Sequence, residues 1–582
     1  MTLDPTPARR TGSRSARWWF ALGLAALVLL AVALRTVFPL ADPPWRSTVG
    51  VVWHDEGAWV HNARNRALFG AWSLDRWNPM YITPVLTGLE YASFRAFGVG
   101  LWQARLVSAT VGTLSVLLLG LGVARTGGRR AGLVAAGLLA TNFVYVSYDR
   151  AALMEATMVA LVVAAWDCYG RAAAAAGWGL VVGLAAVLAY FTKASAIFFL
   201  AALGVDALVA IAWARRDRDG GAAARAAWFT IAGLAAAGVL SLALFVGPHW
   251  QDYRFYNWQM SVTRKPSYTL KAFLDRASWF PVVHDFFTRM WAVTTLAVLG
   301  GLGLALRWRR VAASERLLVL WGLFGMAELV LHDVGNERRL VFLVPSLVGL
   351  AALALARDRR LLTSEAVAVP RRRAVLAAPL LLGCLYLVVG AVVRLPFLDD
   401  LHAGSFHAAV RWSAGVALAL TALLCATWPR VPRLLSRLCW TPAWALAIAV
   451  VVMGADLWQF GEWALIRSYK NYDAMVAVRG WLPPGTLVQG KLANGLALES
   501  AIKPVFVGRG FGNYMDRAHR PDIRYLLTYE KPSLGYESQA QRPVIMDILA
   551  ACPGWVVVHE FDVAESPAGD DRAVLIDKYP RR

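Results

Sequence analysis

Charged residues and cysteines are both scarce in this chain of 582 residues. Asp, Glu, Lys and Arg make up 17% of it, whereas 58% is hydrophobic and the mean hydropathy is +0.49. A soluble domain contains about 25% charged residues, so the composition argues against a soluble class, and the long apolar blocks indicate a polytopic membrane protein. The cysteines have no paired spacing and most lie in or beside apolar segments, which argues against a disulfide framework or a zinc site. They are Cys168, Cys384, Cys425, Cys439 and Cys552.

Acidic residues are fewer than basic ones, and the formal net charge is +21. In a soluble protein this excess would suggest nucleic-acid binding. Here the arginines cluster in short segments between apolar runs, as the positive-inside rule requires of cytoplasmic loops. The positive charge is therefore interpreted as an effect of membrane topology, and nucleic acid is not an expected partner.

The apolar runs predict an all-α polytopic membrane domain over residues 18–458. A span needs about 20 apolar residues, and the sequence predicts about 13 spans. They are Trp18–Leu40, Ala104–Ala124, Ala131–Tyr148, Ala151–Tyr169, Trp178–Phe191, Ala194–Trp213, Ala226–Val246, Met290–Leu306, Leu317–Leu331, Leu340–Ala356, Ala374–Val393, Ala409–Trp428 and Ala443–Trp458. The first run follows the basic residues 1–17, is too long for a signal-peptide core and has no small-residue cleavage site, so it is expected to remain as an anchor.

The arginine-rich loops alternate with the other loops and share a side with the basic N-terminus, residues 1–17. We therefore expect the N-terminus in the cytoplasm, the C-terminus outside, and the protein in the cytoplasmic (inner) membrane. Two long outer loops follow from this topology, residues 41–103 and 247–289. In the tail, residues 459–582, apolar runs shorten and turn residues separate them, which predicts a small extracytoplasmic α/β domain.

An acidic pair, Asp55 and Glu56, stands in a polar stretch just past the first span. These carboxylates can cap a helix that begins near Ala58. They can equally perform acid/base or metal chemistry on a lipid-borne substrate at the mouth of a membrane cavity. Both interpretations fit this position.

Further ionisable residues fall at the predicted outer ends of spans. Asp149 and Arg150 lie in one short turn, where they can simply pair with each other. Lys193 ends another span, where it can extend its amine to the interface. Arg338 and Arg339 break the positive-inside pattern, which suggests a local use for their charge. Lysine and arginine suit a phosphate, and carboxylates suit a base or a divalent cation.

With these motifs in order, the chain resembles the GT-C glycosyltransferases, specifically the bacterial branch of the protein O-mannosyltransferase superfamily that includes the lipid A aminoarabinose transferases. The resemblance covers the chain to about Ala356. The motifs are His54-Asp55-Glu56-Gly57, Asn78-Pro79-Met80-Tyr81-Ile82-Thr83-Pro84, Phe97-Gly98 with Arg105, Tyr148-Asp149-Arg150-Ala151 with Glu155, Phe191-Thr192-Lys193, and Asn336-Glu337-Arg338-Arg339-Leu340 with Pro345.

The resemblance implies an inverting hexosyl or pentosyl transfer from a polyprenyl-phosphate sugar to a lipid, glycan or protein acceptor at the outer face of the bilayer. It makes Asp55 the general base or a metal-oriented carboxylate, with Glu56 and Asp149 as further catalytic acids. It leaves open a divalent metal ion held by Asp55 and Asp149, with no other cofactor.

The same resemblance assigns the donor phosphate to four cations, Lys193, Arg338, Arg339 and Arg150. The aminoarabinose transferases carry a Glu-Lys-Pro-Pro-type segment where this chain has Asn78-Pro79-Met80-Tyr81. No metal ligand is therefore assigned to that segment, and lipid A modification is not assumed.

Two other functions compete with glycosyl transfer, namely a transporter or flippase for lipid-linked saccharides, and a polymer ligase that acts on them. Transporters are built from internal repeats with ionisable groups near the membrane midplane. The sequence has no clear internal repeat, and its charges gather at the outer face, which favours chemistry at the boundary.

Overall fold

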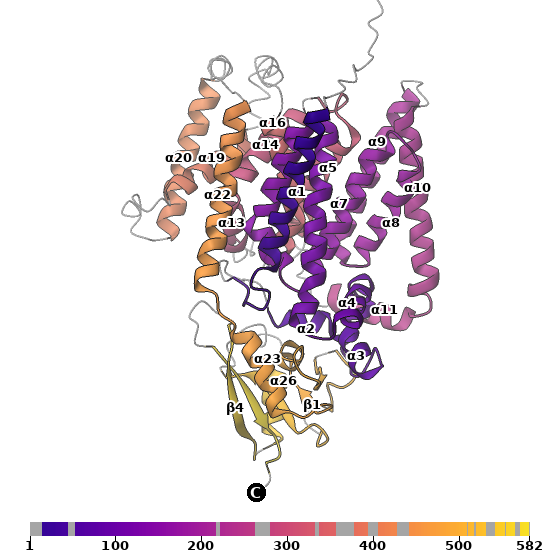
Figure 1. Ribbon diagram of the computed structural model, residues 1–582, viewed down its shortest axis with the longest axis vertical. Helices are drawn as coiled ribbons and strands as arrows, with labels where there is room; N and C mark the ends of the chain where they lie inside the picture. The colour runs from indigo at the N-terminus through magenta and orange to yellow at the C-terminus, as the bar shows by residue number, and fades with distance from the viewer. Residues whose placement is uncertain are drawn as a thin grey trace, which may run out of the picture.

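The computed structural model describes residues 14–44, 53–216, 221–261, 280–305, 307–331, 337–356, 378–393, 406–427, 442–508, 510–516, 520–530, 542–552, 554–564 and 571–580. Most of these residues form a bundle of roughly parallel and antiparallel helices, and a small mixed unit lies at one end of the bundle (Figure 1). The predicted class, an all-α membrane domain with a small C-terminal α/β unit, is confirmed.

Each predicted span overlaps at least one helix of the bundle. The helices are α1 (Arg14–Thr36), α5 (Leu101–Thr141), α6 (Phe143–Asp149), α7 (Met154–Ala172), α8 (Trp178–Tyr190), α9 (Ile197–Arg216), α10 (Ala222–Ser241), α14 (Trp291–Ala305), α15 (Ala313–Leu331), α16 (Val344–Ala356), α19 (Ala378–Val393), α20 (Phe406–Ala426) and α22 (Pro442–Ile466). The predicted span Ala131–Tyr148 covers both the second arm of α5 and α6. Within the described ranges, 7 stretches are long and apolar enough to cross a bilayer unaided, or 8 if the bent pair α6 and α7 counts as one span.

Two predicted spans are joined in α5, which folds back on itself at Gly128. This glycine has a φ of 85°, a conformation that other residues rarely adopt, and it separates two helical arms. The arms lie so close that a Cβ on Gly132 would be 2.5 Å from the carbonyl oxygen of Gly120. Small residues permit this close packing of membrane helices. The packing relies on van der Waals contacts, because the hydrophobic effect does not drive helix association within a bilayer.

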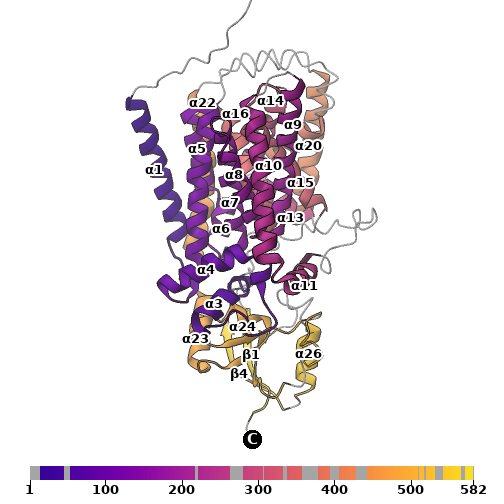
Figure 2. The same ribbon diagram turned by 90° about the vertical axis from the view of Figure 1, so that its right-hand side faces the viewer.

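The first outer loop folds into short helices between the bundle and the C-terminal unit (Figures 1 and 2). They are α2 (Asp55–Trp59), α3 (His61–Phe69), the 3₁₀ turn η1 (Pro79–Tyr81) and α4 (Pro84–Phe97). The second outer loop contributes α11 (Trp250–Ser261) and α13 (Phe280–Arg289). Helices α2, α3, α4 and α11 form a layer at the end of the bundle, whereas α13 lies within the bundle against α14 and α19 (Figures 1 and 2).

The C-terminal unit, residues 470–580, is a mixed sheet with helices. The sheet order is β2-β1-β3-β5-β4, in which β1 runs parallel to β2 and β3, and β5 pairs antiparallel with β3 and β4. Its elements are α23 (Lys470–Trp481), β1 (Leu487–Gln489), α24 (Lys491–Gly495), β2 (Lys503–Val505), β3 (Tyr525–Tyr529), α26 (Arg542–Ala550), β4 (Val556–Asp562) and β5 (Arg572–Asp577). Helix α22 leads into this unit and extends to Ile466, past the residue at which the sequence places the domain boundary.

The C-terminal unit shares a hydrophobic core with the first outer loop. Trp53, Val60 and Ala63 from the loop are buried in one cluster with Leu492 and Leu527 from the unit. The two parts are therefore held together by burial of apolar side chains, which is the main source of stability in folded domains.

Arg64 fixes the same interface from inside α3. Its side chain is buried, and it donates hydrogen bonds to the backbone oxygens of Ala497 (3.1 Å), Ser500 (2.7 Å) and Ile502 (2.9 Å). Buried carbonyls that lose a charged donor bear the full cost of desolvation.

We predict that Arg64→Ala loosens the C-terminal unit from the membrane domain. Each carbonyl left without its partner costs about 1–3 kcal/mol, so limited proteolysis should cut between α22 and α23 faster and the melting temperature should fall. Arg66→Ala is the matched control, because Arg66 lies on the same helix but is exposed. Equal protease resistance of the two variants would contradict this role for Arg64.

Candidate active site

Four charged side chains from four separate segments form a continuous chain at the end of the bundle. Asp55 Oδ2 accepts a hydrogen bond from Arg338 Nη1 at 2.8 Å. Arg338 Nε lies 3.6 Å from Glu155 Oε1, and the same oxygen accepts a hydrogen bond from Lys193 Nζ at 2.6 Å. We call these residues the Asp55 cluster. The structure thus joins Asp55, Lys193 and Arg338, which the sequence predicts as site residues.

Three members of the cluster have partly exposed side chains. The side chains of Asp55, Lys193 and Arg338 are 13%, 17% and 21% exposed, whereas that of Glu155 is fully buried. A buried charge is tolerated only with close partners, so Glu155 has the role of holding the two cations. The more exposed cations can then turn toward a ligand.

Local structure brings each member to this point. Asp55 is the first residue of α2, and Glu155 lies in the first turn of α7, just after the sharp bend of 114° between α6 and α7. Lys193 follows α8 in an extended conformation, with φ −156° and ψ 126°. Arg338 belongs to the 3₁₀ segment η5 (Glu337–Leu343) that precedes α16. Breaks between helices thus supply the charged groups, because these are the places where side chains escape the apolar packing.

The C-terminal unit presses directly on the segment that carries Asp55. A Cβ on Gly57 would lie 2.0 Å from the carbonyl oxygen of Asn494 in α24, so glycine is required there for this approach. The buried His54 ring bonds through Nδ1 to the Tyr529 hydroxyl at 3.1 Å, and its Nε2 lies 3.9 Å from Asp55 Oδ1. The position of Asp55 therefore depends on a domain more than 400 residues away in sequence.

Glu56, predicted as a catalytic acid, has hydrogen-bond partners that give it a structural role. Its Oε1 and Oε2 accept hydrogen bonds from Nε and Nη2 of Arg105, each at 2.8 Å. Oε1 also accepts a hydrogen bond from the backbone N–H of Ala152 at 2.8 Å. The side chain is fully buried. This bidentate pair ties the first loop to α5 and to the α6–α7 bend, and it lies apart from the chain of contacts around Asp55.

Asp149 also has a partner of its own. Its Oδ2 accepts Nε of Arg35 at 2.9 Å and lies 2.8 Å from Nη2 of the same residue, with both side chains completely buried. A Cβ on Gly112 would lie 2.3 Å from Asp149 Oδ2, so α5 closes over the pair. Asp149 and Asp55 are thus held by different arginines, and the pair of Arg35 and Asp149 joins α1 to α6.

The remaining predicted cations differ in their surroundings. Arg150 donates to the backbone oxygens of Leu34 (2.7 Å) and Phe38 (2.8 Å) and stacks on the Trp463 ring at 4.5 Å, which makes it a brace between α1, α6 and α22. Arg339 lies close enough to Lys193 for its charge to help lower the pKa of that ammonium, an effect led by burial and opposed by Glu155. Arg339 thus adds positive charge beside the Asp55 cluster.

The predicted metal site does not fit this arrangement. A divalent cation requires several oxygen ligands around one point, but Asp55 and Asp149 are each bound to a different arginine. Over the described ranges, no group of three or more His, Cys, Asp or Glu side chains is placed to hold a metal ion.

The segment at Asn78, where the chain departs from the aminoarabinose transferases, serves the loop itself. Asn78 accepts a hydrogen bond from Asn62 Nδ2 at 2.9 Å and donates one to the Tyr256 hydroxyl at 2.9 Å. It thereby links α3 to α11, and the departure from the family pattern coincides with an amide network rather than with a cluster of acids.

The sequence motifs include Glu155 but assign it no role in the site. The signal for it was an ionisable residue inside an apolar run, which marks function by default. In a second group, the motifs contain Tyr148 and Glu337 but do not indicate that these residues meet. Glu337 pairs with Arg289, and Glu337 Oε2 accepts a hydrogen bond from the Tyr148 hydroxyl at 3.3 Å. Arg289 belongs to the long second outer loop, so neither periodicity nor a local motif indicates this meeting.

The fold and the site together define a class, a polytopic membrane protein of the GT-C architecture with charged residues gathered beneath a C-terminal unit. Two comparisons agree with it. Residues 83–257 match the family model of dolichyl-phosphate-mannose-protein mannosyltransferases. The crystal structure of ArnT from Cupriavidus metallidurans bound to undecaprenyl phosphate is similar at a TM-score of 0.53 and 16% identity, covering 96% of this chain and 98% of that one.

The apo form of the same ArnT gives the same values. An oligosaccharyltransferase from Archaeoglobus fulgidus is more distant, with a TM-score of 0.47 and 14% identity over 95% of this chain and 75% of that one. Among curated proteins, no sequence matches. The predicted resemblance to the GT-C glycosyltransferases is therefore confirmed, and the structure of this chain has the GT-C fold.

We predict that Asp149 acts through Arg35 and not on a substrate. Asp149→Asn alone leaves the Arg35 charge buried and should cost about 3–5 kcal/mol, because one partner of a buried pair is missing. The double variant Arg35→Met/Asp149→Asn should recover most of the melting temperature and, with it, activity. A double variant that is stable but inactive would show that Asp149 takes part in the reaction.

Proposed function

We propose that this protein is a membrane glycosyltransferase that moves a sugar from a polyprenyl-phosphate donor to an acceptor at the outer face of the cytoplasmic membrane. The observation that supports this most directly is the Asp55 cluster, in which one partly exposed carboxylate adjoins partly exposed cations. That pairing is the minimum for displacing a phosphate from a sugar with a hydroxyl group: a base for the nucleophile and positive charge for the leaving group.

Lys193 and Arg338, with Arg339 nearby, are the proposed binding site of the donor phosphate. In the structure Glu155 contacts both Lys193 and Arg338, and Asp55 also contacts Arg338. The side chains of the two cations remain partly exposed, and their positive charge suits an anionic ligand. Charge-assisted bonds to phosphate would compete for Arg338, since arginine presents a fork that suits such oxygens.

Asp55 is the proposed general base. When Arg338 turns to the phosphate, Asp55 loses its 2.8 Å contact and is left to accept the proton of an acceptor hydroxyl. The hydroxyl oxygen then forms a bond to the anomeric carbon as the bond from that carbon to the phosphate oxygen breaks. Polyprenyl phosphate leaves with the electron pair, and a single displacement of this kind inverts the anomeric configuration.

The donor class and the location are parts of the same proposal. The similar ArnT was crystallised with undecaprenyl phosphate bound, which supports a polyprenyl-phosphate carrier for a chain with the same fold. The proposed topology follows the arginine pattern, with the N-terminus in the cytoplasm and the C-terminal unit outside. The acceptor is drawn from lipids, glycans and proteins of the cell envelope.

We predict that Asp55→Asn abolishes transfer. Asparagine keeps the size of the side chain and can still accept the hydrogen bond from Arg338, but it cannot take a proton. The loss in kcat should be about 10²–10⁴-fold, the usual contribution of a general base. The assay is transfer of a radiolabelled sugar from polyprenyl phosphate, with melting temperature as a check on folding and Asp473→Asn, at an exposed position, as the control. Transfer at the wild-type rate would rule out Asp55 as the base.

We predict that substitutions at Lys193 and Arg150 have different effects, the first on donor binding and the second on stability. Lys193→Ala should raise the apparent KM for the donor roughly 10-fold or more, since a hydrogen bond to a charged group contributes about 1.5–3 kcal/mol. Arg150→Ala should lower the melting temperature with little change in that KM, because Arg150 is occupied by backbone oxygens and Trp463. The reverse pattern would move the phosphate site to Arg150.

A further inference from the structure

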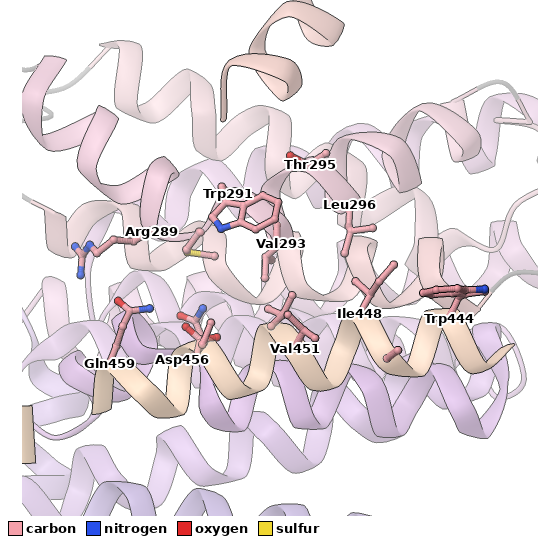
Figure 3. Close-up of a pocket in the computed structure, with 16 residues that line it drawn as sticks. Arg289, Trp291, Val293, Thr295, Leu296, Trp444, Ile448, Val451, Asp456 and Gln459 are labelled. Carbon is pink, nitrogen blue, oxygen red and sulfur yellow. The ribbon is translucent and has the colours of Figure 1, made fainter. Parts of the chain in front are cut away.

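A groove runs between the apolar helices α14 and α22 of the bundle. Its volume is about 410 Å³, within the range of roughly 300–1,000 Å³ that is usual for ligand pockets. The walls are mainly apolar, with Val293 and Leu296 from α14 facing Ile448 and Val451 from α22 (Figure 3).

One end of the groove is polar. Figure 3 shows Arg289, Asp456 and Gln459 together at this end, with Trp444 at the other and the aliphatic side chains between them. Asn142 also lines the groove, and the Asp456 carboxylate accepts the backbone N–H of Phe143 at 3.3 Å. Polar residues inside a membrane domain are costly and are usually functional. A groove with an apolar length and a polar end matches a lipid with its chain and its head group.

The polar end is connected to the Asp55 cluster through η5. Arg289 pairs with Glu337, and the next residue in the chain, Arg338, bonds to Asp55. Tyr148 bonds to the same Glu337. Two neighbouring residues of η5 therefore face different sites: Glu337 meets Arg289 of the groove, whereas Arg338 meets Asp55 and Glu155.

The two sides of η5 suit two different substrates. The donor phosphate, under the proposed function, lies with Lys193 and Arg338, on the side of η5 where Glu155 holds these cations. The groove meets the other side of η5 through the pair of Arg289 and Glu337. A substrate in the groove would place its head group at Arg289, whose partner Glu337 precedes the arginine that contacts Asp55.

We propose that the groove between α14 and α22 binds the hydrocarbon chain of the acceptor, which makes the acceptor a membrane lipid with a hydroxyl-bearing polar head. The amides of Asn142 and Gln459 and the guanidinium of Arg289 provide hydrogen-bond donors for this head, and Asp456 provides an acceptor. The inference rests on the proposed glycosyl transfer and narrows its acceptor to one class.

Two adjacent valines on α22 give a matched test. Val451 lines the groove and Val450 does not, and both are exposed, at 69% and 57%, so tryptophan fits at either position without disturbing the helix core. Val451→Trp narrows the groove, whereas Val450→Trp adds the same bulk toward the surrounding lipid.

The proteins are assayed in nanodiscs with a sugar-labelled polyprenyl-phosphate fraction as donor. Acceptors are the organic-solvent extract of the cell envelope in one arm and the delipidated envelope glycans and proteins in the other. Wild type should label the lipid extract. Val451→Trp should raise the apparent KM for that extract at least 10-fold with the donor KM unchanged, and Val450→Trp should match wild type.

Labelling of the delipidated fraction alone would overturn this inference and leave the proposed function standing, whereas wild-type protein that labels neither fraction would overturn both. Equal behaviour of the two valine variants would also overturn it. A second readout does not need transfer. A lipid extract from cells fed a diazirine fatty acid should, on irradiation, modify the segments 289–296 and 444–459 in wild type and much less in Val451→Trp. Modification that is equal in the two proteins, or absent from these segments in wild type, would contradict the proposal.

Discussion

The pairing of opposite charges in a medium of low dielectric is the constraint on which this structure depends. A lone charge at membrane depth is expensive, and a paired one is tolerable only when its geometry is close. The bundle contains several such pairs, including Arg35 with Asp149, Glu56 with Arg105, and Arg316 with Asp206, whose Nε–Oδ1 distance is 2.8 Å. Each joins helices that apolar packing alone does not align, since lipid tails are as apolar as leucine.

The Asp55 cluster differs from these pairs in its access to solvent. In Arg35–Asp149 both partners are completely buried, and the contact has no room for a ligand. In the Asp55 cluster only Glu155 is fully buried, and the groups that would meet a substrate are partly exposed. Pairs of acidic and basic side chains thus have a structural role where both are fully buried, and a proposed catalytic role where they are partly exposed.

The C-terminal unit gives the cluster its rigidity. Helix α2 is only 5 residues long and has little stability of its own. It is held by the contact of Gly57 with Asn494, by the bond between His54 and Tyr529, and by the Arg64 side chain. A base must be held near its productive position to act. The unit therefore has a part in the site even though it contributes none of the charged side chains of the Asp55 cluster.

Much of the membrane architecture can be predicted from the sequence, because spans are long and apolar and each can be recognised independently of the others. Each predicted span overlaps at least one helix of the bundle. The residue at which the C-terminal domain begins is harder to predict from the sequence. Helix α22 continues beyond the predicted boundary because its last turns pack on the loop at Asp42, where Trp463 bonds to the backbone at 3.1 Å.

By itself the sequence determined the class, the positions of the helices and the kinds of charge at their ends, since hydrophobicity and length are local properties of the chain. Only the tertiary structure decided which charges meet. Asp149 and Asp55 look alike in sequence, but one is sealed against Arg35 on α1 and the other faces Arg338 from a segment 283 residues away. The difference comes from helix packing in three dimensions, which sets the partner, the burial and therefore the chemistry of each carboxylate.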